Sequence, residues 1–141
     1  MSIRSFELKD LNKAMTIWLD TNIKAHHFIH ESYWRQNYEM VKEMVPNAEV
    51  YVFDENQKIK GFVGIDKGYI AGIFVEEKMQ SQGIGKMLLD QCKANYSTLR
   101  LKVYEKNKKA AQFYQREGFK VESAIMDEAT SENELYMIWS K

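Results

Sequence analysis

The segment Gln80–Lys86 carries two glycines one residue apart, where an apolar run ends and a helical pattern of apolar residues begins. Glycine loses more conformational freedom on folding than other residues, so a pair at a helix start indicates a backbone that a ligand approaches closely. The free amides of a helix N-terminus attract anions, phosphate above all. The spacing therefore predicts a phosphate-binding turn built from Gln80, Ser81, Gln82, Gly83, Ile84, Gly85 and Lys86.

Two other phosphate-binding motifs fit this turn badly. A nucleoside-triphosphate loop needs four residues between its glycines and then Lys-Ser/Thr, whereas one residue separates Gly83 from Gly85 and Met87 follows the lysine. A dinucleotide fingerprint needs a third glycine where Leu88 stands, and it closes the first strand of its unit. Three expected strands precede the turn here. Glycines that serve only to start a helix remain the structural alternative.

A second motif lies in residues 103–119, VYEKNKKAAQFYQREGF. The order of its polar, small and aromatic residues, taken with the glycine turn, resembles the GNAT superfamily of N-acetyltransferases: Asn107, Ala110, Phe113, Tyr114, Gly118 and Phe119. The glycine turn then corresponds to the loop that binds the pyrophosphate of coenzyme A. The resemblance covers roughly residues 49–141, and AHHFI at 25–29 with YWR at 33–35 resembles a narrower set of small bacterial members.

The resemblance implies an acetyl-CoA-dependent N-acetyltransferase, of the acyltransferase class, that moves an acetyl group to a primary amine by direct attack. In the family the pantetheine arm lies between two splayed parallel strands, which implies that Val75 bonds the arm and that the Ile73 amide faces the thioester oxygen. Tyr114 would protonate the leaving thiolate, a role that suits a phenol with a pKa of about 10. The implied coenzyme-binding residues are Phe74, Val75, Gln80, Ser81, Gln82, Gly83, Ile84, Gly85, Lys86, Asn107, Ala110 and Tyr114.

The general base is where the sequence departs from the family pattern. Lysine-acetylating relatives of the histone type carry a glutamate where this chain has Tyr69, and a neutral phenol does not readily take a proton from an ammonium. Water could do so, or another residue, with His26, His27 and Glu31 as candidates, or the amine could lose its proton before it binds. A histidine has a suitable pKa, and the spacing that resembles the family favours His26 as the candidate base. The expected substrate pocket comprises His26, Phe28, Tyr33, Trp34 and Tyr69. The acidic loop 127–134 could border the substrate mouth, although a solvated hairpin turn is the plainer interpretation.

The elements that must position these residues follow from hydrophobic periodicity and turn signals. Expected strands are 2–8, a hairpin over 49–66 with its turn at 55–58, then 68–75, 98–104, 119–126 and 134–141. Expected helices are 10–23, 32–45 (beginning at Ser32), one after Gly83, and 107–117. Together they predict an α/β fold with a GNAT-type mixed sheet of about six to seven strands flanked by about four helices. Splayed parallel strands would hold coenzyme A, in a single domain over 1–141.

The bulk composition narrows the possible partners. Twenty basic and twenty acidic residues among 141 cancel, which gives no field for capturing nucleic acid or an anionic membrane. The single cysteine, Cys92, is expected in a helix as a core residue, and no cluster has metal-ligand spacing, so no metal is expected. The absence of an apolar signal core or a membrane-length run favours the cytoplasm.

Several functional alternatives stay open from sequence. One is a module that binds coenzyme A or acyl-CoA without catalysis, which would not require the acid Tyr114. Another is a protein-interaction domain that kept only the fold, which would not require the intact turn Gln80–Gly85. The expected partner is an amine, either a small molecule or a protein lysine or N-terminus, and the chain is expected to be a monomer or homodimer.

Overall fold

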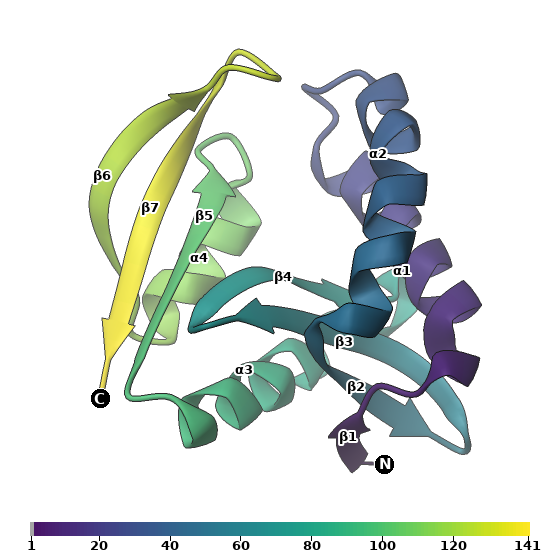
Figure 1. The fold of residues 1–141 in the computed structure, drawn as a ribbon. Coiled ribbons are helices and arrows are strands. Elements are labelled where there is room, and N and C mark those ends of the chain that lie inside the picture. The colour runs from purple at the N-terminus through teal and green to yellow at the C-terminus, as the bar shows by residue number, and fades with distance from the viewer. Residues whose placement is uncertain (1) are drawn as a thin grey trace.

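The computed structural model describes residues 2–141 as one seven-stranded sheet carrying four helices (Figure 1). The strand order across the sheet is β1-β2-β3-β4-β5-β7-β6, and only the β4–β5 pair is parallel. The elements are β1 (Ser2–Ser5), α1 (Leu11–Ala25), α2 (Glu31–Met44), β2 (Glu49–Glu55), β3 (Lys58–Asp66), β4 (Tyr69–Val75), α3 (Ile84–Asn95), β5 (Thr98–Tyr104), α4 (Lys108–Arg116), β6 (Lys120–Asp127) and β7 (Glu132–Ser140). The expected mixed α/β sheet with seven strands and four helices is confirmed.

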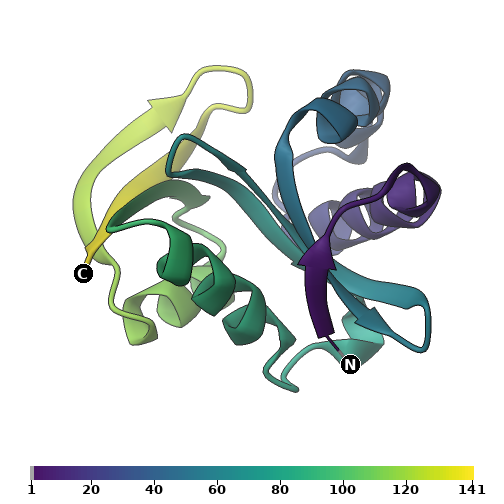
Figure 2. The same cartoon turned by 60° about the horizontal axis from the view of Figure 1, so that its bottom comes forward.

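The helices cover the two faces of the sheet in pairs. Figure 2 shows α1 and α2 on one face and α3 and α4 on the other. Each pair has its own apolar core against the sheet, because strand side chains alternate between the faces. The α3/α4 core contains Leu88, Leu99 and Met137, whereas the α1/α2 core contains Met15, Trp18 and Phe62. Cys92 is fully buried in the first of these, which confirms it as a core residue.

The parallel strands β4 and β5 separate soon after they meet. They pair only at Tyr69 with Arg100 and at Ile70 with Leu101, and beyond this point Figure 1 shows them running apart. The remaining residues of β4, through Val75, keep β3 as their partner on the other side. The sheet therefore opens at its centre, as the splayed pair expected from sequence requires.

Several expected boundaries differ from the structure by one to three residues, and two of these differences lie in the N-terminal part of the chain. The first strand ends at Ser5 rather than residue 8, and Leu8–Asp10 form a short 3₁₀ turn that leads directly into α1. Helix α2 begins at Glu31 rather than Ser32, because the side chain of His30 caps it by accepting a hydrogen bond from the Ser32 amide at 3.1 Å. Histidine is not among the preferred capping residues, so its role was not apparent from the sequence.

A part-buried ion pair holds β1, β2 and the start of α1 together. The guanidinium of Arg4 contacts both carboxylate oxygens of Asp10, at 2.8 and 3.0 Å, and donates to Asp54 at 2.8 Å. The amide of Glu7 also donates to Asp10, which is 6% exposed. Burial alone would raise the pKa of Asp10, but these hydrogen bonds and the Arg4 charge lower its pKa below the ordinary value.

We expect Asp10→Asn to lower the free energy of unfolding by about 2–3 kcal/mol, since the change leaves Arg4 partly uncompensated. The folded-state pKa of Asp10 is lowered, so the stabilisation that ionised Asp10 contributes is complete above its unfolded-state pKa. This stabilisation is lost as the pH falls through the folded-state pKa of Asp10. Urea unfolding should therefore show the two proteins converging below about pH 4. The exposed Asp66 provides the control, and an equal loss in Asp66→Asn would contradict the assignment.

Candidate active site

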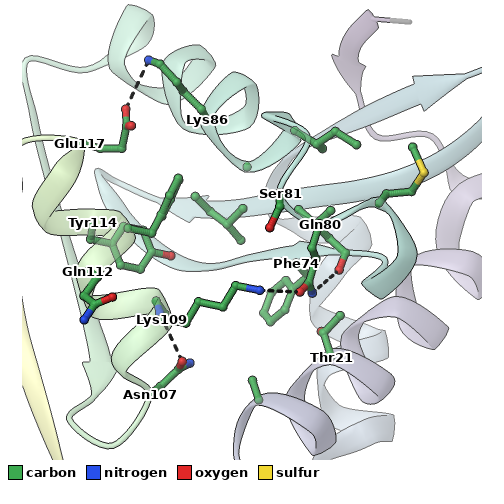
Figure 3. Close-up of a pocket in the computed structure, with 18 of the residues that line it drawn as sticks. Thr21, Phe74, Gln80, Ser81, Lys86, Asn107, Lys109, Gln112, Tyr114 and Glu117 are labelled. Carbon is green, nitrogen blue, oxygen red and sulfur yellow. Dashed lines mark hydrogen bonds and ion pairs between the residues drawn. The ribbon is translucent and has the colours of Figure 1, made fainter.

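A cavity of about 670 Å³ lies where the sheet opens, between the end of β4, the starts of α3 and α4, and the end of α1 (Figure 3). A volume of this size accommodates a cofactor-sized ligand. The walls come from segments far apart in sequence: Thr21, Asn22, Ala25 and His26 on or just after α1; Ile73, Phe74 and Val75 on β4; Met79, Gln80, Ser81, Gly83, Ile84, Gly85 and Lys86 around the glycine turn; and Asn107, Lys109, Ala110, Gln112, Phe113, Tyr114, Arg116 and Glu117 around α4.

The glycine turn forms one wall of this cavity with its backbone. Gly83 precedes α3 in the left-handed conformation (φ 85°) without a side-chain cap, and a Cβ added there would meet no protein atom within 4 Å. The space beside it is therefore open to a ligand. The first amides of α3 have no acceptor within the helix, so the helix start can bind an anion. A Cβ at Gly85, which also lines the cavity, would lie 3.6 Å from the Phe113 ring, an ordinary van der Waals separation, so packing against Phe113 does not require glycine there.

Two members of the expected turn are placed differently from the rest. Gln82 is exposed and is not among the residues that line the cavity. Lys86 lines the cavity, but its ammonium contacts Asp90 at 3.1 Å and Glu117 at 3.3 Å. These carboxylates, Asp90 first, raise the pKa of Lys86. Its charge is thus shared with α3 and the end of α4 rather than directed only at the turn.

Two further cations line the cavity that the sequence analysis did not single out. Lys109 reaches across to Gln80, with its Nζ 3.3 Å from the side-chain oxygen (Figure 3). Arg116 lies with its guanidinium 5.9 Å from the centre of the Phe113 ring. These residues are seven apart on α4, with Phe113 between them. Their helical spacing could have identified them as one face.

The end of β4 presents backbone groups to the opening. The Glu76 amide donates to the Lys60 carbonyl of β3 at 2.8 Å, and amides alternate in direction along a strand, so those of Ile73 and Val75 point away from β3. They face the space beside β5. The side-chain amide of Gln80 donates a hydrogen bond to the Val75 carbonyl at 2.9 Å. It takes the place of the backbone donor that β5 would supply if it still paired with β4 here. The geometry leaves two directed donors, Ile73 and Val75, along the cavity wall.

Tyr114 projects into the cavity from α4. The residue is 8% exposed, its ring packs between Phe113 and Phe119, and Figure 3 shows its hydroxyl directed into the open space. Burial raises the pKa of Tyr114 above its ordinary value, so the phenol keeps its proton at neutral pH. A protonated hydroxyl in this position can act as a hydrogen-bond donor or a general acid.

Asn107 and His26 connect the two sides of the cavity. Asn107 caps α4 by accepting from the Ala110 amide at 3.3 Å, and its side-chain nitrogen lies 3.3 Å from Nε2 of His26. The other ring nitrogen of His26, Nδ1, lies 3.0 Å from the Asn22 carbonyl. Both contacts fit the neutral tautomer in which Nδ1 carries the proton. Burial lowers the pKa of His26 to about 4.

The environment of His26 weighs against its expected role as the base. Its ring is stacked 5.0 Å from Trp34 and makes edge contacts with Phe28 and Tyr104. The lone pair of Nε2 already accepts from Asn107, and a group with so low a pKa is a weak acceptor for the proton of an ammonium. The base assignment to His26 stays a prediction.

The other expected substrate-pocket residues do not line this cavity. Trp34 is buried in the α1/α2 core, while Phe28 packs edge-on against Tyr104. Tyr69 lies at the start of β4 beneath the guanidinium of Arg100, 5.7 Å from the ring centre. Tyr33 contacts Trp34 at the start of α2. Phe28, Tyr33 and Trp34 therefore belong to the apolar cluster under α1 and α2 rather than to the cavity.

Two absences can be stated for residues 2–141. No group of three or more His, Cys, Asp or Glu side chains in this range could hold a metal ion. No helix in the described part of the chain is both long and apolar enough to cross a membrane.

Known proteins resemble this chain over most of its length. The family of the acetyltransferase (GNAT) domain matches residues 20–132. The peptidyl-lysine N-acetyltransferase YiaC of Escherichia coli (strain K12) is 33% identical over 139 residues, which cover 97% of this chain and 95% of that protein. The solution structure of apo YjaB from Escherichia coli has a TM-score of 0.87 at 23% identity, covering 98% of this chain and 96% of that one. The PaiA N-acetyltransferase of Thermoplasma acidophilum in complex with coenzyme A has a TM-score of 0.79 at 21% identity, with both chains fully covered at 100%.

We expect Gly83→Val to abolish measurable acetyl-CoA binding in calorimetry while the protein stays folded. The added branches would occupy the open space beside the α3 amides and would strain a left-handed residue. Gly68→Ala is the matched control, because Gly68 is also left-handed (φ 84°) but lies in the turn before β4, away from the cavity. Unchanged affinity in a folded Gly83→Val protein would remove the turn from the binding site.

Proposed function

This chain belongs to the GNAT acetyltransferase family, and on that premise we propose that its acetyl acceptors are lysine side chains of proteins. The enzyme is an N-acetyltransferase that uses acetyl-CoA. The observation that carries the acceptor class is the full-length relationship to YiaC, whose name specifies peptidyl-lysine. The YjaB protein of Salmonella typhimurium, 28% identical over 86% of this chain, has the same named activity.

The residues of the cavity fit acetyl-CoA. In this proposal the α3 amides after Gly83 hold the pyrophosphate, with Lys109 and Arg116 as nearby positive charges. The Val75 amide bonds the pantetheine arm as a strand would, since its carbonyl is already taken by Gln80. The Ile73 amide then lies where the thioester oxygen gains charge. A backbone donor aimed at that oxygen contributes about 3–4 kcal/mol to transition-state stabilisation.

The leaving thiolate would take its proton from Tyr114. Its hydroxyl points into the cavity, and burial keeps it protonated until a stronger base develops nearby. Much of the remaining rate comes from holding donor and acceptor together, because favourable orientation is worth about 7–11 kcal/mol. Asn107 and Ala110 support this geometry by starting α4 beside the arm.

The acceptor class is tested with peptides whose N-terminus is blocked and which carry a single lysine. We expect mass spectrometry to locate the acetyl group on the lysine Nζ, with thiol release in equal amount. The same peptide with arginine in place of lysine is the matched control and should release no thiol. Acetylation confined to free α-amino groups or to small diamines would contradict the proposal.

We expect Tyr114→Phe to lower kcat by about 10²-fold, as loss of a general acid does, with little change in acetyl-CoA affinity. The ring and its contacts with Phe113 and Phe119 are kept, so the melting temperature should barely change. Tyr38→Phe removes a hydroxyl from α2, outside the cavity, and controls for the substitution itself. Turnover near that of the unaltered enzyme would mean that another group protonates the thiolate.

A further inference from the structure

Two of the four carboxylates in the acidic hairpin 127–134 have opposite surroundings. Asp127 is fully engaged, because it accepts hydrogen bonds from Tyr104 at 2.8 Å, from the Thr130 hydroxyl at 3.1 Å and from the Ala129 amide at 3.2 Å. Glu134 is half-buried, and within residues 2–141 its carboxylate makes no hydrogen bond or ion pair. A half-buried carboxylate without a partner is costly, and such groups occur most often at functional sites.

Strand pairing places Glu134 beside the opening of the sheet. Ile70 of β4 pairs with Leu101 of β5, and beyond that pair the two strands separate, where the β3–β4 register also shifts between Gly64 and Ile65. Tyr104 lies beyond this point on β5 and pairs directly with Glu134 of β7. The carboxylate therefore belongs to the β5–β7 side of the opening, and the Ile73 amide belongs to its β4 side.

The direction of side chains along β7 places Glu134 on the acceptor side of the sheet. Its neighbours Leu135 and Met137 pack in the α3/α4 core, so alternation turns Glu134 toward the α1/α2 face. Tyr104, its cross-strand partner, belongs to the α1/α2 core. Tyr114 lies on the α3/α4 side. The leaving-group acid and Glu134 thus face the opening from opposite sides, as attack and departure at one carbonyl require.

The groups around Glu134 include the aromatic residues expected to form the substrate pocket. Burial first, and the Glu134 charge second, raise the pKa of Tyr69 on β4. Burial first, and the Asp127 charge second, raise the pKa of Tyr33 on α2, with a smaller contribution from Glu134. Burial first, and Asp127 second, raise the pKa of Glu134, while Lys102 opposes them. The charged and titratable groups facing this position are Tyr33 on α2, Tyr69 on β4, Arg100, Lys102 and Tyr104 on β5, Asp127 on β6 and Tyr136 on β7.

From this geometry we infer that Glu134 receives the ammonium of the acceptor lysine and takes a proton from it. The inference rests on the proposed function, since it assumes a lysine acceptor. Tyr33 and Tyr69 would flank the aliphatic stem of the lysine, while the carboxylate holds its charged end. The sequence left this role to water, His26, His27 or Glu31, because nothing local to residue 134 distinguishes it from a solvated turn.

The proton balance of the step is complete. The ammonium loses one proton to Glu134, and the neutral amine attacks the thioester carbon to form the C–N bond. As the C–S bond breaks, the thiolate takes the Tyr114 proton, and the second proton lost from nitrogen restores the phenol. The amide keeps the third. Glu134 then releases its proton to water, so that one proton is released in each turnover.

The test is Glu134→Gln, assayed with the N-terminally blocked lysine peptide across pH. We expect kcat/KM to fall by about 10²-fold at neutral pH, with acetyl-CoA affinity and melting temperature unchanged. In the unaltered enzyme kcat/KM should rise with pH through the raised pKa of Glu134, since the carboxylate is the active form. The variant should lose that limb and recover activity only as free amine accumulates. Glu134→Asp, which keeps the charge on a shorter side chain, should retain more activity than Glu134→Gln.

A neutral acceptor separates proton transfer from a structural role. When the lysine is replaced by an aminooxy analogue, whose nitrogen is uncharged at neutral pH, Glu134→Gln should approach the unaltered enzyme in rate. Glu132→Gln is the matched control on the same hairpin, where Glu132 pairs with Lys106, and it should leave the pH profile unchanged. His26→Gln should likewise keep the rise of kcat/KM with pH that we assign to Glu134, which we call the acidic limb of the profile.

Three results would overturn the inference. They are an unchanged pH profile in Glu134→Gln, an equal loss with lysine and aminooxy peptides, and disappearance of the acidic limb in His26→Gln. Failure of the unaltered enzyme to acetylate any lysine peptide would instead remove the proposed function. The two failures are therefore distinguishable.

Discussion

The separation of β4 from β5 is the constraint on which the rest of the site depends. Strands in the middle of a sheet normally satisfy each other's amides and carbonyls, and here that pairing stops at Ile70 and Leu101. Backbone groups that lose a partner strand need another partner, because an unpaired buried donor or acceptor costs free energy. Gln80 supplies one for the Val75 carbonyl. The amides of Ile73 and Val75 face the opening, so a break in the sheet leaves backbone donors that a ligand could use.

The two faces of the open sheet hold different chemical groups. The face covered by α3 and α4 carries the glycine turn, the cations Lys109 and Arg116, and the buried phenol of Tyr114. The face covered by α1 and α2 carries aromatic side chains and the carboxylate of Glu134, which has no hydrogen-bond or ion-pair partner among residues 2–141. A donor with a phosphate end and an acceptor with a cationic end can thus approach one point from opposite sides. This division follows from the alternation of side chains on β5 and β7.

A short chain of hydrogen bonds joins these faces at the end of the cavity. Asn107 caps the helix that carries Tyr114 and also donates to His26, which in turn donates to the Asn22 carbonyl of α1. Protonation of His26 would set a ring N–H against the side-chain NH₂ of Asn107. This series of hydrogen bonds therefore requires the neutral imidazole. Burial among Trp34, Phe28 and Tyr104 lowers the pKa of His26 and keeps it neutral. We interpret His26 as a residue that positions α4 relative to α1.

Local spacing was enough to predict some features of this protein. The glycine turn, the Asn107–Tyr114 pattern and the hairpins each occupy a short segment, so the element order and most of the expected coenzyme-binding residues, which line one cavity, could be predicted. Tertiary structure decided what depends on partners distant in the chain. Glu134 reaches the opening only through its pairing with β5, beyond the point where β5 leaves β4, and His26 owes its low pKa to rings from α2 and β5. Electrostatics and register of this kind arise from three-dimensional packing, which no local pattern of residues encodes.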